Sequence, residues 1–250
     1  MSNKIFNYLI KIEYDGTNFV GWQYQKNGKT VQEVIEKALF KIFKSKIKIS
    51  GAGRTDKGVH AIGQHANFKI KEKIESENKF LNSINFFLKK TLISITKIKK
   101  KNSHFHSRHD AKERIYEYKI MNRIGSLSLN KNKAWHIKKK LSIKILKKGS
   151  KILEGTHDFS TFRASSCSSY SPIKKMNVVH VKKKGDEITI EFKSKSFLQN
   201  QVRSMVGSLI YLSCGKWTLN NFKKVFNSKK RSKCAPPAPA HGLYLKDVKY

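Results

Sequence analysis

The residues Phe6-Asn-Tyr-Leu-Ile-Lys-Ile-Glu-Tyr14 place an aromatic or aliphatic side chain at every second position. Because successive side chains of a strand point to opposite faces of a sheet, this alternation predicts a half-buried strand, ended by Asp15-Gly16. Thr30 and Glu33 form a capping box, and helically spaced apolar residues follow it, so a helix is predicted there. Strands are also expected at residues 47–50, 64–70 and 92–98, with a second helix around 80–88. The resulting β-α-β-β-α-β order is that of a ferredoxin-like unit.

The second half of the chain has a similar pattern. A strand is predicted at 114–120 and a helix at 141–153, although Gly149 interrupts that helix. The segments predicted after it are a hairpin of residues 178–183 and 187–193 turned at Gly185-Asp186, helices at 202–214 and 219–226, and a strand at 243–249. We therefore expect an α/β (α+β) protein with an N-terminal domain (1–105) and a C-terminal domain (106–250). These two ferredoxin-like or RNP-like halves would form an extended, mostly antiparallel sheet with helices on one side and a central basic cleft, a place for a long ligand.

The charge of the chain is extreme: 53 Lys and Arg against 17 Asp and Glu give a formal net charge of +36 over 250 residues. Such a protein is expected to bind polyanions, with nucleic acid the leading candidate. Only seven of the 53 basic residues are Arg, and Lys, Ile and Asn are all heavily used. This usage is typical of an AT-rich genome, so part of the positive charge is expected to be compositional background.

Cysteine usage and hydropathy indicate a cytoplasmic location. Cys167, Cys214 and Cys234 are odd in number and widely spaced, which argues against a disulfide framework and fits a reducing compartment. The chain begins without an apolar signal region, and its uncharged run at 204–215 is too short to span a bilayer. We expect a soluble cytoplasmic protein.

The segment Gly51-Ala-Gly-Arg-Thr-Asp-Lys-Gly-Val-His-Ala61 concentrates chemical groups between glycines. Arg54 and Asp56 are two positions apart, so in extended backbone they project to the same side, where the guanidinium would keep the carboxylate ionised. An oriented carboxylate on a glycine-bounded loop is suited to act as a covalent nucleophile. A surface ion pair in an ordinary loop is the alternative.

Other candidates have two interpretations each. His104, His106 and His109 could bind zinc, but no further ligands have suitable spacing, which favours RNA contact or local capping. Tyr116 and Tyr118 share one strand face, where a ring packs in the core or stacks on an extruded base.

Arg203 and Cys167 are two further residues whose side chains could take part in chemistry. Arg203 opens an apolar helix, where a buried ion pair or a phosphate contact would account for it. Cys167 lies among serines without an adjacent histidine and is expected to be inert.

Nearly the whole chain resembles the TruA-type tRNA pseudouridine synthase family. The resemblance is carried by the following ordered segments: Tyr14-Asp-Gly-Thr-Asn-Phe-Val-Gly-Trp-Gln23, Thr30-Val-Gln32, Gly53-Arg-Thr-Asp-Lys-Gly-Val-His-Ala61, Phe105-His-Ser-Arg108, Arg114-Ile-Tyr-Glu-Tyr118, Asp158-Phe-Ser-Thr-Phe-Arg163, Val202-Arg-Ser-Met-Val-Gly207 and Gly242-Leu-Tyr-Leu245. Chance agreement does not produce so many motifs in the same order. They also favour an RNA-facing element over a metal site for the three histidines.

The resemblance implies isomerisation of uridine to pseudouridine at positions 38, 39 and 40 of the tRNA anticodon stem-loop. By this resemblance Asp56 is the nucleophile, Arg54 pairs with it and helps hold the flipped base, and Tyr116 stacks on the uracil and assists loss of the carbon-5 proton. Arg203 is suited to a second ion pair or a phosphate. No metal or organic cofactor is implied, and the family works as a homodimer. The residues expected to contact RNA are Lys57, His60, Phe105, His106, Arg108, Arg163 and Lys174.

The sequence departs from the family pattern at two positions, and two other functions remain as alternatives. Lys57 stands where many relatives have a small residue, and Lys174 where relatives often have Arg, which puts a bidentate contact there in doubt. A noncatalytic RNA-binding or RNA-folding protein would explain the charge but not the Arg54–Asp56 arrangement. A nucleotide-binding enzyme of small molecules would need a phosphate loop, and the sequence has no recognisable one.

Overall fold

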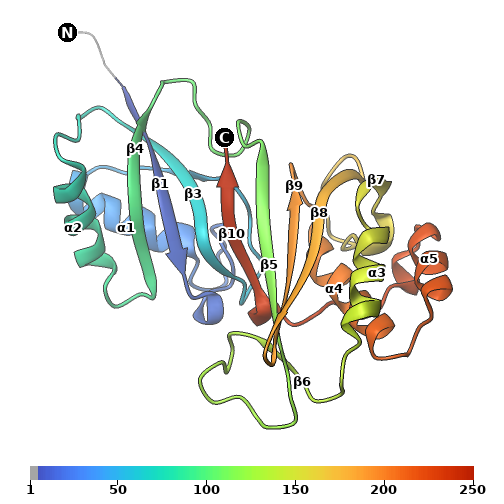
Figure 1. Ribbon diagram of the computed structural model, residues 1–250. Helices are drawn as coiled ribbons and strands as arrows, with labels where there is room; N and C mark the ends of the chain where they lie inside the picture. The colour runs from blue at the N-terminus through green and yellow to red at the C-terminus, as the bar shows by residue number, and fades with distance from the viewer. Residues whose placement is uncertain (1–4) are drawn as a thin grey trace. The chain divides into compact units, whose positions relative to one another are not determined.

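The predicted first strand is present from Phe6 to Tyr14 in a computed structural model that describes residues 5–250. The described residues form ten strands and five α-helices, so the expected mixed α/β class is confirmed (Figure 1). They divide into unit 1, which comprises residues 5–112 with Leu245–Tyr250, and unit 2, Glu113–Tyr244. Among the described helices, none combines the length and the apolar character needed to cross a membrane.

Unit 1 is built on an antiparallel sheet. Its strands are β1 (Phe6–Tyr14), β2 (Ile49–Gly51), β3 (His60–Ile70), β4 (Ile93–Lys101) and most of β10 (Leu243–Lys249). β1 lies between β4 and β3, with Ile10 opposite both Ala66 and Ile98, and β2 pairs with β3. The order β4-β1-β3-β2 is the predicted ferredoxin-like arrangement, with β10 an additional neighbour of β3.

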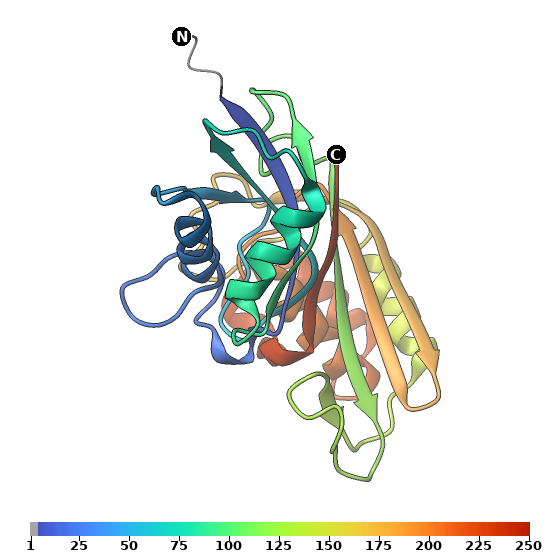
Figure 2. The same cartoon turned by 90° about the vertical axis from the view of Figure 1, so that its left-hand side faces the viewer.

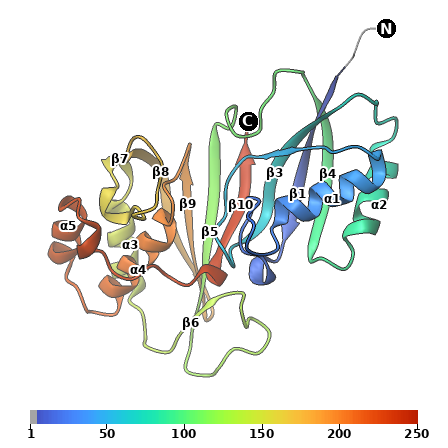
Figure 3. The ribbon, with the colours of Figure 1, turned by 180° about the vertical axis from the view of Figure 1, so that it is seen from behind.

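Two helices, α1 (Val31–Phe43) and α2 (Glu77–Leu88), cover one face of the unit 1 sheet. They contact one another, as Figure 2 shows from the unit 1 side, and α1 crosses in front of β1 and β3 in Figure 3. The predicted cap is confirmed, because the Thr30 side chain accepts a hydrogen bond from the Glu33 N–H. Ile35, Leu39 and Ile84 are buried on the sheet side of these helices, where each contributes about 1.5–3 kcal/mol.

Unit 2 repeats this plan with additions. Its strands are β5 (Glu113–Asn122), β6 (Trp135–Ile137), β7 (Gly155–Asp158), β8 (Ile173–Lys184) and β9 (Glu187–Ser194). β9 lies between β5 and β8 in antiparallel register, as β3 lies between β1 and β2 in unit 1, and the predicted β8–β9 hairpin is present. β7 extends the far edge, and β6 pairs with β5 in the parallel direction.

The helices of unit 2 pack on one another through small residues. They are α3 (Ile143–Ile152), α4 (Gln201–Ser213) and α5 (Leu219–Asn227). Gly149 lies inside α3 because its missing side chain makes room for α4: a β-carbon there would lie 2.5 Å from a methyl group of Leu212 and 2.9 Å from one of Leu209. The glycine that weakened the helix prediction is therefore a contact point between α3 and α4.

Candidate active site

The glycine-rich loop between β2 and β3 is held from inside unit 1 by Gln64. This side chain is fully buried, and its Oε1 accepts a hydrogen bond from the Gly53 N–H at 3.2 Å. Its Nε2 donates to the Gly53 carbonyl at 2.7 Å. One amide thus satisfies both backbone groups of Gly53, which fixes the loop at the residue before Arg54.

Thr55 fixes the same loop immediately before the predicted nucleophile. Its hydroxyl lies 2.7 Å from the Tyr14 hydroxyl at the end of β1, and both residues are buried. Its carbonyl accepts the Trp22 N–H at 3.1 Å. The Trp22 indole occupies the space beside Gly51, where a β-carbon would lie 2.4 Å from Nε1. Residues from β1 and the following segment therefore hold both ends of the Gly51–Thr55 stretch.

Asp56 lies at the start of a tight turn and is half-buried. Its carbonyl accepts the Val59 N–H at 3.1 Å, and Gly58 completes the turn with a φ of +77°, a conformation that favours glycine. The Gly58 N–H donates to the Phe19 carbonyl at 3.3 Å. The carboxylate is thus mounted on a turn whose backbone has few alternatives, as a nucleophile requires.

Arg54 and Lys57 lie on either side of Asp56 and are exposed. Arg54 therefore presents its guanidinium to solvent, and its pairing with Asp56 stays a prediction. The exposure of both side chains leaves the predicted RNA contact of Lys57 a prediction as well.

His60 begins β3 and is buried, unlike its neighbours in the loop. Its Nδ1 lies 3.0 Å from the Gly16 N–H and 3.0 Å from Oδ1 of Asp15. Whichever of these two contacts its tautomer forms, the ring ties the catalytic loop to the turn that ends β1. A buried imidazole does not reach RNA without rearrangement, so this position supports a structural role, and the RNA contact stays a prediction.

The segment Phe105-His-Ser-Arg108 is attached to the catalytic loop by Ser107. The Ser107 hydroxyl donates to the carbonyl of Ser50, the residue before Gly51, and its N–H donates to Oδ1 of Asn67 at 2.9 Å. Asn67 also donates to Asn7, whose own amide donates to the Phe105 carbonyl at 2.8 Å. This buried polar network brings two predicted motifs together within unit 1.

The other side chains of the Phe105–Arg108 segment differ in their exposure to solvent. The Phe105 ring is buried against Tyr250, with centroids 5.0 Å apart, so it supports the segment from beneath. Arg108 is exposed, and its N–H donates to Nδ1 of His106 at 3.2 Å. Burial and the neighbouring His109 lower the pKa of His106, which favours a neutral ring. Among the described residues, no group of His, Cys, Asp and Glu is arranged to hold a metal ion.

Tyr116 and Tyr118 of β5 have different surroundings in unit 2. Tyr118 is fully buried, donates its hydroxyl to the Pro239 carbonyl at 2.7 Å and leaves no room for a side chain at Gly242. Burial raises its pKa well above the usual range, so its hydroxyl stays protonated. The Tyr116 ring meets Phe197 edge-on, with centroids 5.0 Å apart. Core packing, one of the two predicted roles, is confirmed for Tyr118.

Arg203 is in the first turn of α4 and is anchored on the segment before β10. Its Nε donates to the Ala238 carbonyl at 2.8 Å, and the Ala238 N–H donates back to the Arg203 carbonyl at 2.9 Å. A further N–H of the guanidinium donates to Asn200 Oδ1 at 3.2 Å. This anchoring positions a cation beside Tyr118 and His241. Burial, with a smaller contribution from Arg203, lowers the pKa of His241, whereas Arg203 only partly opposes the burial that raises the pKa of Tyr118.

Arg163 and Lys174, the second residue of β8, lie at the two ends of one loop of unit 2 and donate hydrogen bonds to its carbonyls. Arg163 donates to Cys167 and Ser169 at 2.6 and 2.7 Å, and Lys174 donates to Ser171 at 2.8 Å. Burial lowers the pKa of Lys174. The two cations shape this loop and retain further donors, so their predicted RNA contacts stay open.

The sequence does not single out Gln64, Tyr14 or Ser107 as site residues, although each contacts the glycine-rich loop or the β2 residue that precedes it. Tyr14 lies in the first segment that carries the family resemblance, Tyr14–Gln23, but the sequence assigned it no role. Ser107 lies in the Phe105-His-Ser-Arg108 motif but was likewise given no role. Gln64 gave no signal, because an isolated polar residue does not reveal which backbone group it will meet.

Comparisons with known proteins identify relatives over nearly the whole chain. A family model described as "tRNA pseudouridine synthase" matches residues 10–110 and 150–250. The protein named "tRNA pseudouridine synthase A" of Pelagibacter ubique (strain HTCC1062) is 56% identical over 246 residues, covering 98% of this chain and 100% of that protein. Proteins of the same name are 39% identical in Maricaulis maris (strain MCS10), covering 97% of both chains, and 42% identical in Thermoanaerobacter sp. (strain X514), covering 98% and 99%.

A solved structure, "Crystal Structure of a Cbf5-Nop10-Gar1 Complex", matches 81% of this chain and 44% of its own with 12% identity and a TM-score of 0.36. The fold of this chain is instead assigned from its own strand order and from its relatives. From the family model and the full-length identities, the chain belongs to the TruA-type tRNA pseudouridine synthase family.

Proposed function

We propose that this enzyme modifies positions 38, 39 and 40 of the tRNA anticodon stem-loop, with Asp56 as its covalent nucleophile. Its family membership makes it an isomerase that converts uridine to pseudouridine in tRNA. The observation that best supports Asp56 is the fixed position of the backbone just before it. Tyr14, Trp22 and Gln64 each form a hydrogen bond with Gly53 or Thr55. The noncatalytic RNA-binding alternative has no support from the relatives.

The chemistry requires one carboxylate and no redox partner. The bond between N1 of uracil and C1′ of ribose breaks, the base turns, and a bond from C5 to C1′ forms. C5 then loses its proton and N1 carries one, so the product is an isomer of the substrate. Asp56 forms a transient bond to the substrate and is regenerated when the new bond is complete.

Tyr116 and Arg203 are the proposed contributions of the second half. Tyr116 would stack on the extruded uracil and assist loss of the carbon-5 proton, and Arg203 would pair with Asp56 or a phosphate. Arg54, exposed beside Asp56, would hold the flipped conformation. In this proposal a domain of residues 1–105 carries the nucleophile, and a domain of residues 106–250 completes the cleft. No metal or organic cofactor is required.

Binding would rely on the RNA backbone and on stacking. Extruding a base costs a few kcal/mol, and stacking on Tyr116 would offset about 1–3 kcal/mol of it. Cationic side chains would contact phosphates without reading sequence, which suits an enzyme that acts at neighbouring positions of different tRNAs. The proposed RNA contacts are Lys57, His106, Arg108, Arg163 and Lys174, whereas the buried His60 and Phe105 would reach RNA only if the site rearranged on binding. We also propose that the enzyme is a cytoplasmic homodimer.

Site mapping tests this proposal. Transcripts of one tRNA with uridine at only one of positions 38, 39 and 40 would be treated with enzyme, and pseudouridine located by carbodiimide adducts that stop reverse transcription. Stops are expected at each of the three positions and at no other uridine. Modification confined to another arm of the tRNA would refute the positional assignment while leaving the isomerase activity intact.

A further inference from the structure

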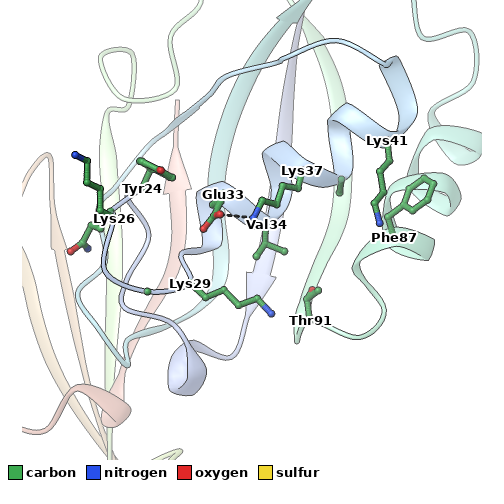
Figure 4. Close-up of a pocket in the computed structure, with 12 residues that line it drawn as sticks. Tyr24, Lys26, Lys29, Glu33, Val34, Lys37, Lys41, Phe87 and Thr91 are labelled. Atoms are coloured by element: carbon green, nitrogen blue, oxygen red, sulfur yellow. Dashed lines mark hydrogen bonds and ion pairs between the residues drawn. The ribbon is translucent and has the colours of Figure 1, made fainter.

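Unit 1 has a groove of about 540 Å³ lined by α1, by the loop before it and by residues at the end of α2. We call it the α1 groove. The residues that give it its character are Tyr24, Lys26, Lys29, Lys37, Lys41 and Phe87. Figure 4 shows Lys26 and Lys29 on the loop before α1 and Lys41 at the other end, toward α2. None of these residues has a place in the proposed catalytic set.

The groove is strongly cationic. Four of its lining residues are lysines, and Glu33 is the one carboxylate among the lining residues, already paired with Lys37 at 2.5 Å. Lys29 and Lys41 lie over aromatic rings, 5.7 Å from the Phe19 centroid and 5.4 Å from that of Phe87. The rings support the side chains of these two lysines and leave their charge available to a ligand.

An exposed aromatic side chain lies among these lysines. Tyr24 is 55% exposed, whereas Trp22, two residues earlier, is buried beneath the catalytic loop. Lysines interspersed with an accessible ring are the combination that binds nucleic acid, since the charges track the phosphates and the ring stacks on a base.

The groove and the nucleophile turn are also parts of one structural element. Phe19, which carries Lys29 on its ring, accepts the Gly58 N–H through its carbonyl. Gly21 lies so close to the catalytic turn that a β-carbon there would be 2.8 Å from the Thr55 carbonyl oxygen. An RNA held in the groove would therefore be held by the same segment that supports the turn of Asp56.

We infer that the α1 groove is a second RNA-contact surface, which binds the phosphate backbone of the tRNA substrate and stacks a base on Tyr24. The inference rests on the proposed function, because it takes tRNA as the ligand. Charge complementarity favours RNA over an apolar partner. Glu33 and Gln25 are the one carboxylate and the one amide side chain among the groove-lining residues, so the groove is suited to bind the RNA backbone rather than to read its sequence.

The test compares the salt dependence of tRNA binding between two triple variants. Lys26→Gln/Lys29→Gln/Lys41→Gln removes three groove charges, and Lys144→Gln/Lys147→Gln/Lys148→Gln removes three from the exposed face of α3. Binding of an unmodified tRNA transcript would be measured from 50 to 300 mM KCl. Each lost phosphate contact lowers the slope of log K against log salt by about 0.7–0.9, so the groove variant is expected to lose about 2 in slope. The α3 control is expected to keep the wild-type slope.

Tyr24→Ala and Tyr24→Phe test the stacking separately. Alanine is expected to weaken tRNA binding about tenfold, and phenylalanine, which keeps the ring, to bind like wild type. Wild-type slopes in the groove variant, or equal losses in the groove and α3 variants, would overturn the inference. Tritium release by the wild-type enzyme, followed on the same transcript, reports the proposed function independently. A failed groove prediction is therefore distinguishable from a failed assignment of activity.

Discussion

The Tyr14 hydroxyl at the end of β1 lies 2.7 Å from the hydroxyl of Thr55, the residue immediately before Asp56. Both residues are buried, so the bond is shielded from water. It links the central strand of unit 1 directly to the backbone that carries the proposed nucleophile. Because small displacements of a catalytic group cost large factors in rate, we expect this bond to affect activity as well as stability.

Tyr14→Phe removes this bond and keeps the ring. The lost hydrogen bond is expected to cost about 1 kcal/mol of stability, and the looser loop to lower the single-turnover rate about tenfold. The Kd for tRNA should stay within twofold of wild type. Rate and Kd would be measured on the same transcript. A variant with the wild-type rate would show that the Thr55 hydroxyl does not depend on Tyr14 for its position.

Gln64→Ala leaves both backbone groups of Gly53 without partners. Because each unpaired buried group costs about 1–3 kcal/mol, the loop is expected to lose its fixed geometry, and the single-turnover rate to fall at least a hundredfold. Gln64→Glu, which keeps the acceptor for the Gly53 N–H, should lose less. Circular dichroism would check that both variants fold. Equal rates for the two variants would contradict a bracing role for the acceptor half of the amide, and a wild-type rate for Gln64→Glu would contradict one for the donor half.

Gly207→Ala tests the anchoring of Arg203. A β-carbon at this position of α4 would lie 2.0 Å from the Pro236 carbonyl oxygen, so the segment that binds Arg203 through Ala238 must move. We expect the variant to fold less stably and to lose most of its single-turnover activity. Gly215→Ala, at a position with open space and a φ of +80°, is the matched control and should affect stability alone. Stability curves in urea and tritium release measure the two effects.

His65 predicts a pH dependence of stability. Burial lowers its pKa from 6.5 to about 4. The charges of Lys11 and Lys101 also lower this pKa, and the carboxylate of Asp247 partly opposes them. Between those two pH values the unfolded chain binds a proton that the folded chain does not, so the free energy of unfolding should fall as the pH decreases from 6.5 to 4. His65→Gln should reduce this decline, whereas His180→Gln, at an exposed position on β8, should keep it. Urea midpoints at pH 7, 6 and 5 provide the measurement.

The strands and helices with regular patterns were predictable from the sequence. The first strand, the Thr30 cap and the closing strand at 243–249 were confirmed, because alternation and capping are local properties. β6 and β7 were not predicted, since three- and four-residue strands are too short to show a period. β3 begins at His60 rather than at 64, because Gly63 broke the apparent alternation at a position where the Lys246 backbone approaches closely.

The site was predictable only as far as local motifs reach. Glycines around Asp56 signal a special backbone, and the sequence shows them directly. The roles of Gln64 and Ser107 depend on carbonyls and N–H groups that fold against them, which no spacing reveals. The burial of His60 follows from the position of the turn that ends β1, so its role was likewise set by tertiary structure.

The central claim is that Asp56 is the nucleophile, and one measurement tests it most directly. Wild type and Asp56→Asn would each be mixed in excess with tRNA carrying uridine tritiated at carbon 5, and tritium release followed over a single turnover. The account predicts release by wild type, none by the variant, and the same Kd for tRNA in both. Release by Asp56→Asn at a comparable rate would show that another group carries the chemistry. A parallel loss of binding and activity would make Asp56 a structural residue.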